Sequence, residues 1–281
     1  MTIDFHTHIF PRHMLNHREE YMKRDSCFAE LNSSPKAKII CAEELIESMD
    51  KESIQTSVIL NIGWCSHELC VETNDYIMES AARYSGRLYP FCTIQPTSAH
   101  ALSELERCIR NGIYGIGEMR PDIQGYDLCD KQLMSDIVAL CIKNNLCFLT
   151  HSSEPVGHQY SGKGNISTAM LFQFASNFPQ LKFICSHWGG GLPFYALMPE
   201  VAEILKNTYF DTAASPFLYR PQIYEHMVNI ISSKKILFGS DYPLMPQSRV
   251  ISQIQQAHIT KKAKQDILAD NARSILNINC S

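Results

Sequence analysis

Short, wholly apolar runs alternate along this chain with longer segments in which apolar residues recur at helical spacing. Runs such as Val58–Leu60 and Phe183–Cys185 are apolar at nearly every position, as in strands that are buried on both faces. Between the runs, apolar residues fall three or four positions apart, for example at Leu102, Leu105 and Ile109. Strands that alternate with helices indicate βαβ units and a parallel sheet.

Eight such repeats can be counted, which predicts a closed barrel rather than an open sheet. Strands are expected near residues 2–6, 56–61, 88–94, 113–118, 146–151, 181–187, 208–212 and 235–240. Helices are expected near residues 42–52, 70–84, 98–111, 130–144, 167–177, 193–206, 220–232, 248–257 and 264–276. The length of 281 residues suits one barrel, so the sequence predicts a single α/β domain, a (β/α)8 TIM barrel, over residues 1–281.

Two connections are too long to be simple turns. Residues 9–41 follow the first strand and are predicted to form an insertion that caps the active site. Residues 152–165 follow the fifth strand and are rich in Gly, Ser and Pro, so this loop is expected to line the substrate pocket and to move.

Charge and cysteine content exclude several classes of protein. The formal net charge is −4 and no basic block occurs, so neither a nucleic-acid surface nor an anionic-membrane surface is indicated. No apolar stretch approaches the roughly 20 residues that span a bilayer, and no secretory signal is recognised. The eleven cysteines are scattered and odd in number, which favours reduced thiols in a soluble cytoplasmic protein.

The first predicted strand ends in the pair His6-Thr-His8. Side chains alternate along a strand, so both histidines point to the same side, about 6.5–7 Å apart along the chain. That separation allows two imidazoles to bind one metal ion at roughly 2.0–2.1 Å each. The spacing therefore makes His6 and His8 candidate metal ligands.

Four more ligand-type residues each stand at the end of an apolar run: Glu118, His151, His187 and Asp241. Active sites of (β/α)8 barrels form at the C-terminal ends of the strands, where all six of these residues are expected to meet. Singly, each could have a structural role, for instance Glu118 as an ion-pair partner of Arg120. Together, imidazole and carboxylate ligands favour zinc, with manganese or iron as lesser possibilities.

The motifs Asp4-Phe-His-Thr-His8 and Gly239-Ser-Asp-Tyr-Pro243 resemble those of the amidohydrolase superfamily. Across the whole chain the pattern is similar to the amidohydrolase-related branch, which includes aminocarboxymuconate-semialdehyde decarboxylase and uncharacterised metal-dependent hydrolases. The resemblance implies a barrel of the metal-dependent hydrolase type in which His6, His8 and Asp241 hold a first metal. It also implies that His151 is a further ligand of this ion or of a second one, and that His187 is a second-metal ligand or a catalytic histidine.

Glu118 departs from the decarboxylase pattern, which uses one metal and needs no carboxylate at this place. A glutamate at the end of the fourth strand looks more like the bridging ligand of TatD-type hydrolases, in a similar Ile-Gly-Glu setting. One or two metal ions are therefore expected. A TatD-like nuclease is disfavoured because the chain has no basic stripe.

These residues predict hydrolysis of a small-molecule amide, lactone or ester by metal-activated water, with Asp241 as the acid and base. His187 or the metal would polarise the carbonyl group. The alternative is a non-oxidative decarboxylase of a carboxylated small molecule that uses a single metal. A metal-binding regulator without activity is a third possibility, although every ligand position is filled.

Four further residues are predicted to contact the substrate: Arg120, His158, Tyr160 and Lys163. Arg120 could clamp a substrate carboxylate through two hydrogen bonds, or only neutralise Glu118. Lys163 could bind an anionic group or simply be solvated. The expected partner is a small molecule, and apolar residues within 9–41 make a homodimer possible.

Overall fold

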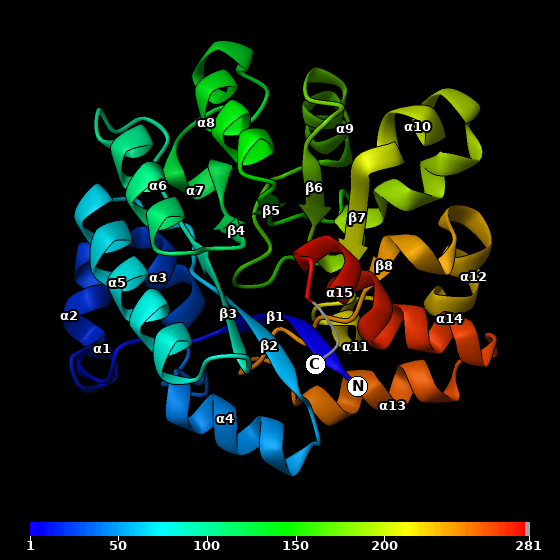
Figure 1. Cartoon of the computed structure of the whole chain (residues 1–281), viewed down its shortest axis with the longest axis horizontal. Helices are drawn as coiled ribbons and strands as arrows, with labels where there is room; N and C mark the ends of the chain where they lie inside the picture. Colours follow the sequence, from blue (N-terminus) through cyan, green and yellow to red (C-terminus); the bar gives the residue numbers. More distant parts are fainter. Residues whose placement is uncertain (279–281) are drawn as a thin grey trace.

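The computed structural model describes residues 1–278, which form a barrel of eight parallel strands with helices around it (Figure 1). The strands are hydrogen-bonded in the order β1 to β8, each beside its neighbour in the sequence. The ring closes between β8 and β1, where the Phe5 N–H donates to the Phe238 carbonyl at 2.7 Å. The His8 N–H donates to the Tyr242 carbonyl at 2.8 Å, and Thr7 bridges to Tyr242. The predicted TIM barrel is confirmed.

The strands occupy the predicted runs, with small differences at their ends. They are β1 (Ile3–His8), β2 (Thr56–Leu60), β3 (Leu88–Cys92), β4 (Gly115–Met119), β5 (Cys147–Thr150), β6 (Lys182–Cys185), β7 (Thr208–Asp211) and β8 (Ile236–Leu237). The eighth strand is two residues long, and beyond it the chain still runs beside β1, where Phe238 and Tyr242 accept the N–H groups of Phe5 and His8. Nearly every strand residue is buried, as expected of strands covered on both faces.

Helices follow the strands and form the outer layer. They are α4 (Ala42–Lys51), α5 (His67–Arg83), α6 (Ala101–Arg110), α8 (Lys131–Lys143), α9 (Thr168–Asn177), α10 (Pro199–Ile204), α12 (Ile223–Ile231), α13 (Gln247–Gln256), α14 (Lys261–Gln265) and α15 (Asn271–Leu276). Further helical segments are α7 (Pro121–Gln124), α11 (Ser215–Leu218), η1 (His187–Leu197), η2 (Leu205–Asn207), η3 (Ser233–Lys235) and η4 (Asp266–Asp270). Several helices begin where a Ser, Asp or Thr side chain accepts a backbone N–H, as Ser66, Asp130, Ser167 and Thr260 do.

One cluster of apolar side chains fills the inside of the barrel. It joins Phe5 of β1, Leu60 of β2, Phe91 of β3 and Leu149 of β5, strands that lie on different sides of the ring. Side chains from such strands can meet only within it. Helix α15 adds Ile275 to the same cluster. The filled interior gives the strand ends a rigid base.

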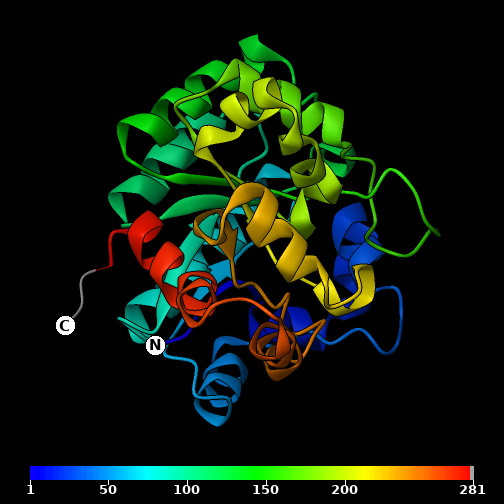
Figure 2. The same cartoon turned by 90° about the vertical axis from the view of Figure 1, so that its right-hand side faces the viewer.

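Residues 9–41 fold into three short helices instead of an irregular loop: α1 (Arg12–Asn16), α2 (Arg18–Arg24) and α3 (Ser26–Asn32). Phe28 of α3 stacks on Trp64 with ring centroids 5.4 Å apart, and Phe10 packs against both rings. Helix α3 also contacts the loop of residues 152–165, because Glu30 accepts hydrogen bonds from Ser161 and Gly162. Figure 2 shows this loop, in green, beside the blue helices.

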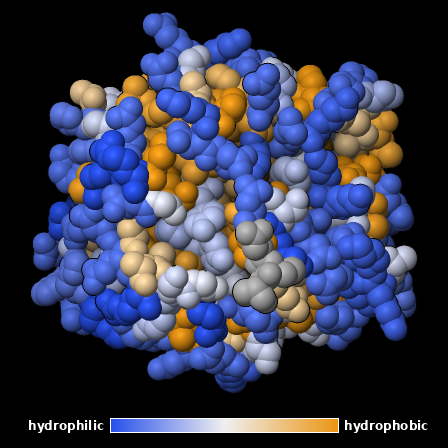
Figure 3. Space-filling view, in the orientation of Figure 1, coloured by the Kyte–Doolittle hydropathy of each residue, from blue (hydrophilic) through white to orange (hydrophobic). Residues whose placement is uncertain are grey.

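Among residues 1–278 no helix is both long and apolar enough to cross a membrane. The face in Figure 3 is largely hydrophilic, with hydrophobic residues in separate patches. Ten cysteines of the described part are free thiols, and Cys280 lies outside the described residues. The cytoplasmic location stays a prediction.

Candidate metal centre

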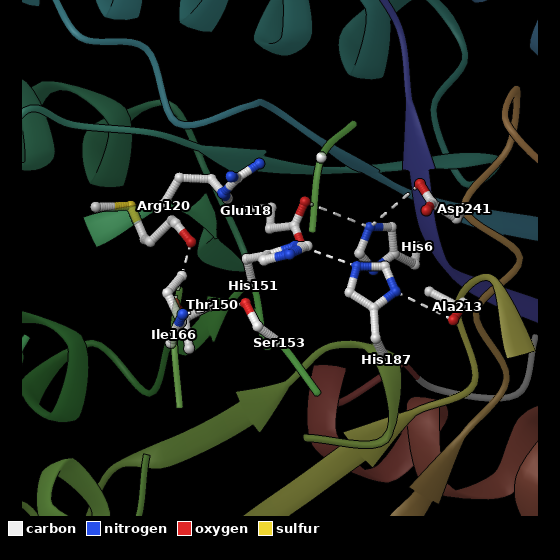
Figure 4. A network of polar contacts seen from close by, with 12 residues as sticks. His6, Glu118, Arg120, Thr150, His151, Ser153, Ile166, His187, Ala213 and Asp241 are labelled. Carbon is white, nitrogen blue, oxygen red and sulfur yellow. Dashed lines mark hydrogen bonds and ion pairs between the residues drawn. The ribbon is translucent and has the colours of Figure 1, made fainter. Parts of the chain in front are cut away.

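All six predicted ligand residues lie at the C-terminal ends of the strands. Figure 4 labels all of them except His8. His6 and His8 belong to the end of β1, and Glu118 to β4. The other three come directly after strands or their short extensions, namely His151, His187 and Asp241. Every one of them is at most 9% exposed. The barrel therefore gathers these side chains in one buried place, as the sequence predicts.

His6, His8 and Asp241 form a first possible ligand set. The Nε2 atoms of His6 and His8 are 3.0 Å apart, and Asp241 Oδ1 is 3.8 and 3.5 Å from them. Two ligand atoms that each lie about 2.1 Å from a shared ion stand roughly 3.0–3.4 Å apart at octahedral to tetrahedral angles. The distances are close to this range, so the three side chains fit a divalent ion with little adjustment.

Glu118 links this set to a second one, His6, Glu118 and His187. Glu118 Oε2 lies 3.8 Å from Nε2 of both His6 and His8. Its other oxygen lies 3.4 Å from His187 Nε2. A carboxylate between two sets of imidazoles is the position of a bridging ligand, and the number of ions remains a prediction.

His151 lies outside both sets. Its Nδ1 is 3.0 Å from Glu118 Oε1, and its Nε2 is 3.0 Å from the backbone carbonyl of Lys163. Both ring nitrogens are thus occupied by contacts with oxygen atoms. In this arrangement His151 supports Glu118, and a role as a direct metal ligand would require it to leave the Lys163 carbonyl.

The cluster is strongly ionic without a metal. Burial acts to lower the pKa of His6, but the Asp211 and Glu118 carboxylates raise it to about 9. Burial also opposes protonation of His187, yet the hydrogen bond and charge of Glu118 raise its pKa to about 10. Burial acts to raise the pKa of Asp241, whereas the contact with His8 and the charge of His6 lower it to about 2. A divalent ion could take the place of these protons beside the carboxylates.

Two of these residues have unusual backbone conformations. His187 has φ 54° and Asp241 has φ 67°, in the left-handed region that residues other than glycine rarely adopt. Register shifts also occur in β1 between Asp4 and Thr7 and in β4 between Ile116 and Met119, beside His6 and Glu118. Irregularities of this kind redirect side chains next to functional sites.

Asp211 is a site residue that the sequence analysis missed. It ends β7, is fully buried, and its Oδ2 lies 2.8 Å from His6 Nδ1. The sequence could have indicated this residue, because an acidic side chain near the C-terminal end of a predicted strand lies at the same rim of the barrel as the other candidates. Its partner is not visible in the sequence, since 205 positions separate the two residues.

A cavity of about 560 Å³ opens above the cluster. His8, Glu118, His151, His187 and Asp241 line it, together with Arg120, His158 and Tyr160. Most of the remaining lining is apolar and comes from separate segments: Phe10, Leu31, Ile62, Val156, Phe217, Leu218 and Leu244. The cavity suits a small molecule with an apolar body and a polar group at the metal end.

Arg120 lines the cavity but is not free to act as a clamp. It is 1% exposed, and its guanidinium donates to Asp122 at 3.2 Å and to Glu30 at 3.2 Å. Burial acts to lower its pKa, but the surrounding acidic groups raise it. These hydrogen bonds go to Asp122 and Glu30, while the charge of Glu118 also helps to raise the pKa of Arg120. Contact of Arg120 with a substrate stays a prediction.

Lys163 also has a place that the sequence did not suggest. It is 5% exposed, and its Nζ donates to the carbonyls of Val156 and His158 at 3.1 and 3.2 Å. Its side chain is therefore neither solvated nor directed to a substrate, but holds its own loop together. His158 and Tyr160 of that loop do line the cavity, and Tyr160 donates to Glu154 at 3.0 Å.

A (β/α)8 barrel with histidines and carboxylates gathered at its C-terminal rim defines the metal-dependent barrel enzymes as a class. Within it, residues 3–278 match the family model Amidohydro_2, described as Amidohydrolase. Because the match covers nearly the whole chain, the protein belongs to this family. It is an enzyme of the amidohydrolase superfamily, as the motifs around His6 and Asp241 predict.

Known proteins of the same kind include two with curated activities. The chain is 21% identical over 99% of its length, and 92% of the other, to 2-amino-3-carboxymuconate-6-semialdehyde decarboxylase of Dictyostelium discoideum. It is 26% identical over 50% of its length, and 47% of the other, to 2-keto-4-carboxy-3-hexenedioate hydratase of a Sphingobium strain.

A solved structure shares the fold over the whole chain. It is 5-carboxyvanillate decarboxylase of Novosphingobium aromaticivorans, complexed with manganese and 4-hydroxy-3-methoxy-5-nitrobenzoic acid. The TM-score is 0.81 at 14% identity, with 99% of this chain and 96% of that chain covered.

These comparisons correct the predicted activity. The main prediction, hydrolysis of an amide, lactone or ester, is wrong, because the whole-length relative and the solved structure are decarboxylases. The alternative, a metal-dependent decarboxylase, is better supported. The physical reason for the error is that the same ligands serve hydrolysis and decarboxylation, so the ligand pattern alone does not select the reaction.

Proposed function

We propose that this protein is a metal-dependent, non-oxidative decarboxylase of a small conjugated carboxylic acid. The observation that carries the proposal is the similarity over 99% of the chain to a decarboxylase that acts on a carboxylated muconate semialdehyde. The buried ligand cluster below a largely apolar cavity supports it. The names of all three known proteins contain a carboxy-substituted compound, which supports the substrate class.

His6, His8 and Asp241 are the residues that would hold the divalent ion, with Glu118 and His187 beside them. Such an ion would bind substrate oxygen and withdraw electron density from the carbon that bears the carboxylate. The manganese in the decarboxylase structure supports Mn²⁺ as a candidate beside the predicted Zn²⁺.

Decarboxylation needs a proton at the carbon that bears the carboxylate. When the bond to the carboxylate carbon breaks, its electron pair stays with the protonated carbon and carbon dioxide leaves. His187 is placed to supply this proton, because Nδ1 is engaged with the Ala213 carbonyl at 3.1 Å and Nε2 is the remaining nitrogen. Asp241 is the other residue at the cavity floor that could accept or return a proton.

The cavity wall supports a flat or apolar substrate body. Phe10 and Ile62 come from the segments after β1 and β2, and Phe217 and Leu244 from the segments after β7 and β8. A substrate bound between these apolar walls would displace water, which would strengthen electrostatic interactions at the floor. His158 and Tyr160 are candidates for contacts with the polar end that lies farthest from the metal.

The test uses protein reconstituted with Mn²⁺ or Zn²⁺ and a panel of carboxylated phenols and carboxylated unsaturated acids in deuterated water. We expect release of carbon dioxide and one solvent deuterium on the carbon that lost the carboxylate. The variant His187→Gln should lose this activity while keeping its fold, as circular dichroism would report. Product formation with water-derived ¹⁸O in a new acid group, and no carbon dioxide, would contradict the proposal.

Hydration is a second candidate, favoured by the half-length similarity to a hydratase. It would act on the same kind of carboxylated, unsaturated substrate but add water across a double bond. The same experiment separates the two reactions, since hydration retains the carboxylate and gains one water. A gain of water without loss of carbon dioxide would replace the decarboxylase proposal with this one.

A further inference from the structure

Asp211 uses both of its carboxylate oxygens at the metal centre. Oδ2 lies 2.8 Å from Nδ1 of His6. Oδ1 accepts the backbone N–H of His187 at 2.9 Å and that of Ala213 at 3.0 Å. Side chains of His6 and Asp211 are both fully buried, so water does not compete for these bonds.

The first contact determines which nitrogen of His6 is free. A carboxylate only accepts hydrogen bonds, so Nδ1 of His6 carries the hydrogen that points to Asp211. In the neutral ring, Nε2 then holds a lone pair and faces His8, Glu118 and Asp241. His6 is the one residue common to both possible ligand sets, so its orientation bears on any ion bound in either.

The second oxygen acts on His187. This residue has φ 54°, a conformation that needs support from its surroundings. Asp211 holds its backbone N–H directly, and it also holds Ala213, whose carbonyl contacts Nδ1 of His187 at 3.1 Å. Through these bonds one carboxylate fixes both the backbone and the ring of His187.

We propose that Asp211 is a positioning residue that sets the metal-binding tautomer of His6 and the placement of His187 together. The inference rests on the proposed metal centre but not on the reaction that follows. Asp211 lies outside the cavity lining, and it acts through the two histidines.

The sharpest change is Asp211→Asn, because the two side chains have the same shape. If the amide oxygen keeps the two backbone N–H groups, the amide nitrogen faces His6 and donates to Nδ1. Nε2 of His6 must then carry the hydrogen and lose the lone pair that binds metal. If the amide is reversed, its nitrogen faces two N–H donors and holds neither.

Two measurements on the full-length protein test the proposal. Nitrogen-15 NMR of the metal-free protein, recorded at a pH above the raised pKa of His6 so that the ring is neutral, reports the His6 tautomer, with the signal assigned by its loss in His6→Ala. Competition with a chromophoric chelator reports the affinity for Zn²⁺. We expect wild type to carry the His6 hydrogen on Nδ1, and Asp211→Asn to carry it on Nε2 and to bind Zn²⁺ about 10–100-fold more weakly.

Glu104→Gln is the matched control. Glu104 is also a buried carboxylate in a hydrogen-bond network, with Asn74 and Arg107, but it lies on helix α6 away from the cavity. This variant should leave the His6 tautomer and Zn²⁺ affinity within about twofold of wild type, since second-shell effects are local. Any loss common to both variants would then reflect stability alone.

Zn²⁺ affinity of Asp211→Asn within threefold of wild type, or an unchanged His6 tautomer in that variant, would overturn the proposal. If the variant does not fold, the wild-type spectrum still decides, because a neutral, metal-free His6 whose hydrogen lies on Nε2 and not on Nδ1 contradicts the assignment. Failure of wild type to bind Zn²⁺ would instead count against the metal centre, and the tautomer would still test Asp211.

Discussion

The cavity floor, formed by the candidate ligand residues at the strand ends, and the loop that borders the cavity are held in place in different ways. The floor residues are at most 9% exposed, and each is fixed by a strand end and by buried neighbours such as Asp211. The loop of residues 152–165 has no helix or strand, and Val156 within it is 76% exposed. Its shape depends on a few hydrogen bonds to Glu30 and Lys163. Substitutions in the floor should therefore affect chemistry, and those in the loop should affect access and binding.

The largest effect is expected for Asp241→Asn. The change removes a negative ligand and a group that can exchange a proton, so kcat should fall by about 10²–10⁴-fold. Steady-state kinetics with metal-saturated protein measures it, and Asp136→Asn on the exposed side of α8 is the control. A kcat within threefold of wild type would place Asp241 outside the chemistry.

Glu118→Ala should change metal content rather than fold. If Glu118 bridges two ions, wild type binds up to two Zn²⁺ ions under metal-replete conditions and the variant binds at most one. Elemental analysis after gel filtration measures the ratio, with the exposed Glu47→Ala on α4 as the control. Equal ratios in wild type and Glu118→Ala would show that Glu118 does not bridge.

Glu30→Gln tests the contact between helix α3 and the loop. The change weakens the ion pair with Arg120 and the hydrogen bond from Gly162, so the loop should open more often. We expect a rise in KM of about 3–10-fold with kcat little changed, the pattern for binding shared by ground and transition states. Glu19→Gln on the exposed face of α2 is the control. A fall in kcat without a change in KM would instead show that the Glu30 contacts affect the chemical step and not substrate binding.

Lys163→Met should have the smallest effect. It keeps the length of the side chain but removes the bonds to the Val156 and His158 carbonyls, each worth about 0.5–1.5 kcal/mol locally. Hydrogen exchange should rise across residues 154–163, with Tm close to wild type because the loop adds little to the core. A large loss of Tm, or unchanged exchange in the loop, would contradict this account.

The sequence predicted the scaffold and the meeting place of the candidate ligands because both follow from local patterns, whereas metal binding by these residues stays a prediction. Apolar runs gave the positions of the strands, and the place of His6, His8 and Asp241 at strand ends gave their meeting point. Glu118 stood out because it departs from the decarboxylase pattern and resembles the bridging ligand of TatD-type hydrolases, and it does lie between the other side chains.

What the sequence missed depends on contacts between distant parts of the chain. The buried bonds of Arg120 to Glu30 and of His6 to Asp211 join residues with no local relation. Lys163 was expected to bind an anionic group or to be solvated, yet it is buried and its Nζ donates to backbone carbonyls of its own loop. The reaction was also misassigned, since ligand type fixes the metal site but not the bond that breaks.

The closing contact of the barrel would give a metal ion bound at this centre a role in folding. His6 and His8 stand on β1, Asp241 follows β8, and the ring closes between these two strands through Thr7 and Tyr242. Joining the first strand to the last costs loop entropy over most of the chain. An ion that binds only when β1 and β8 are paired would favour the folded state by mass action, because its ligands come from both sides of this junction. Chelation would then lower thermal stability first at the junction of β1 and β8, before the remaining strands separate.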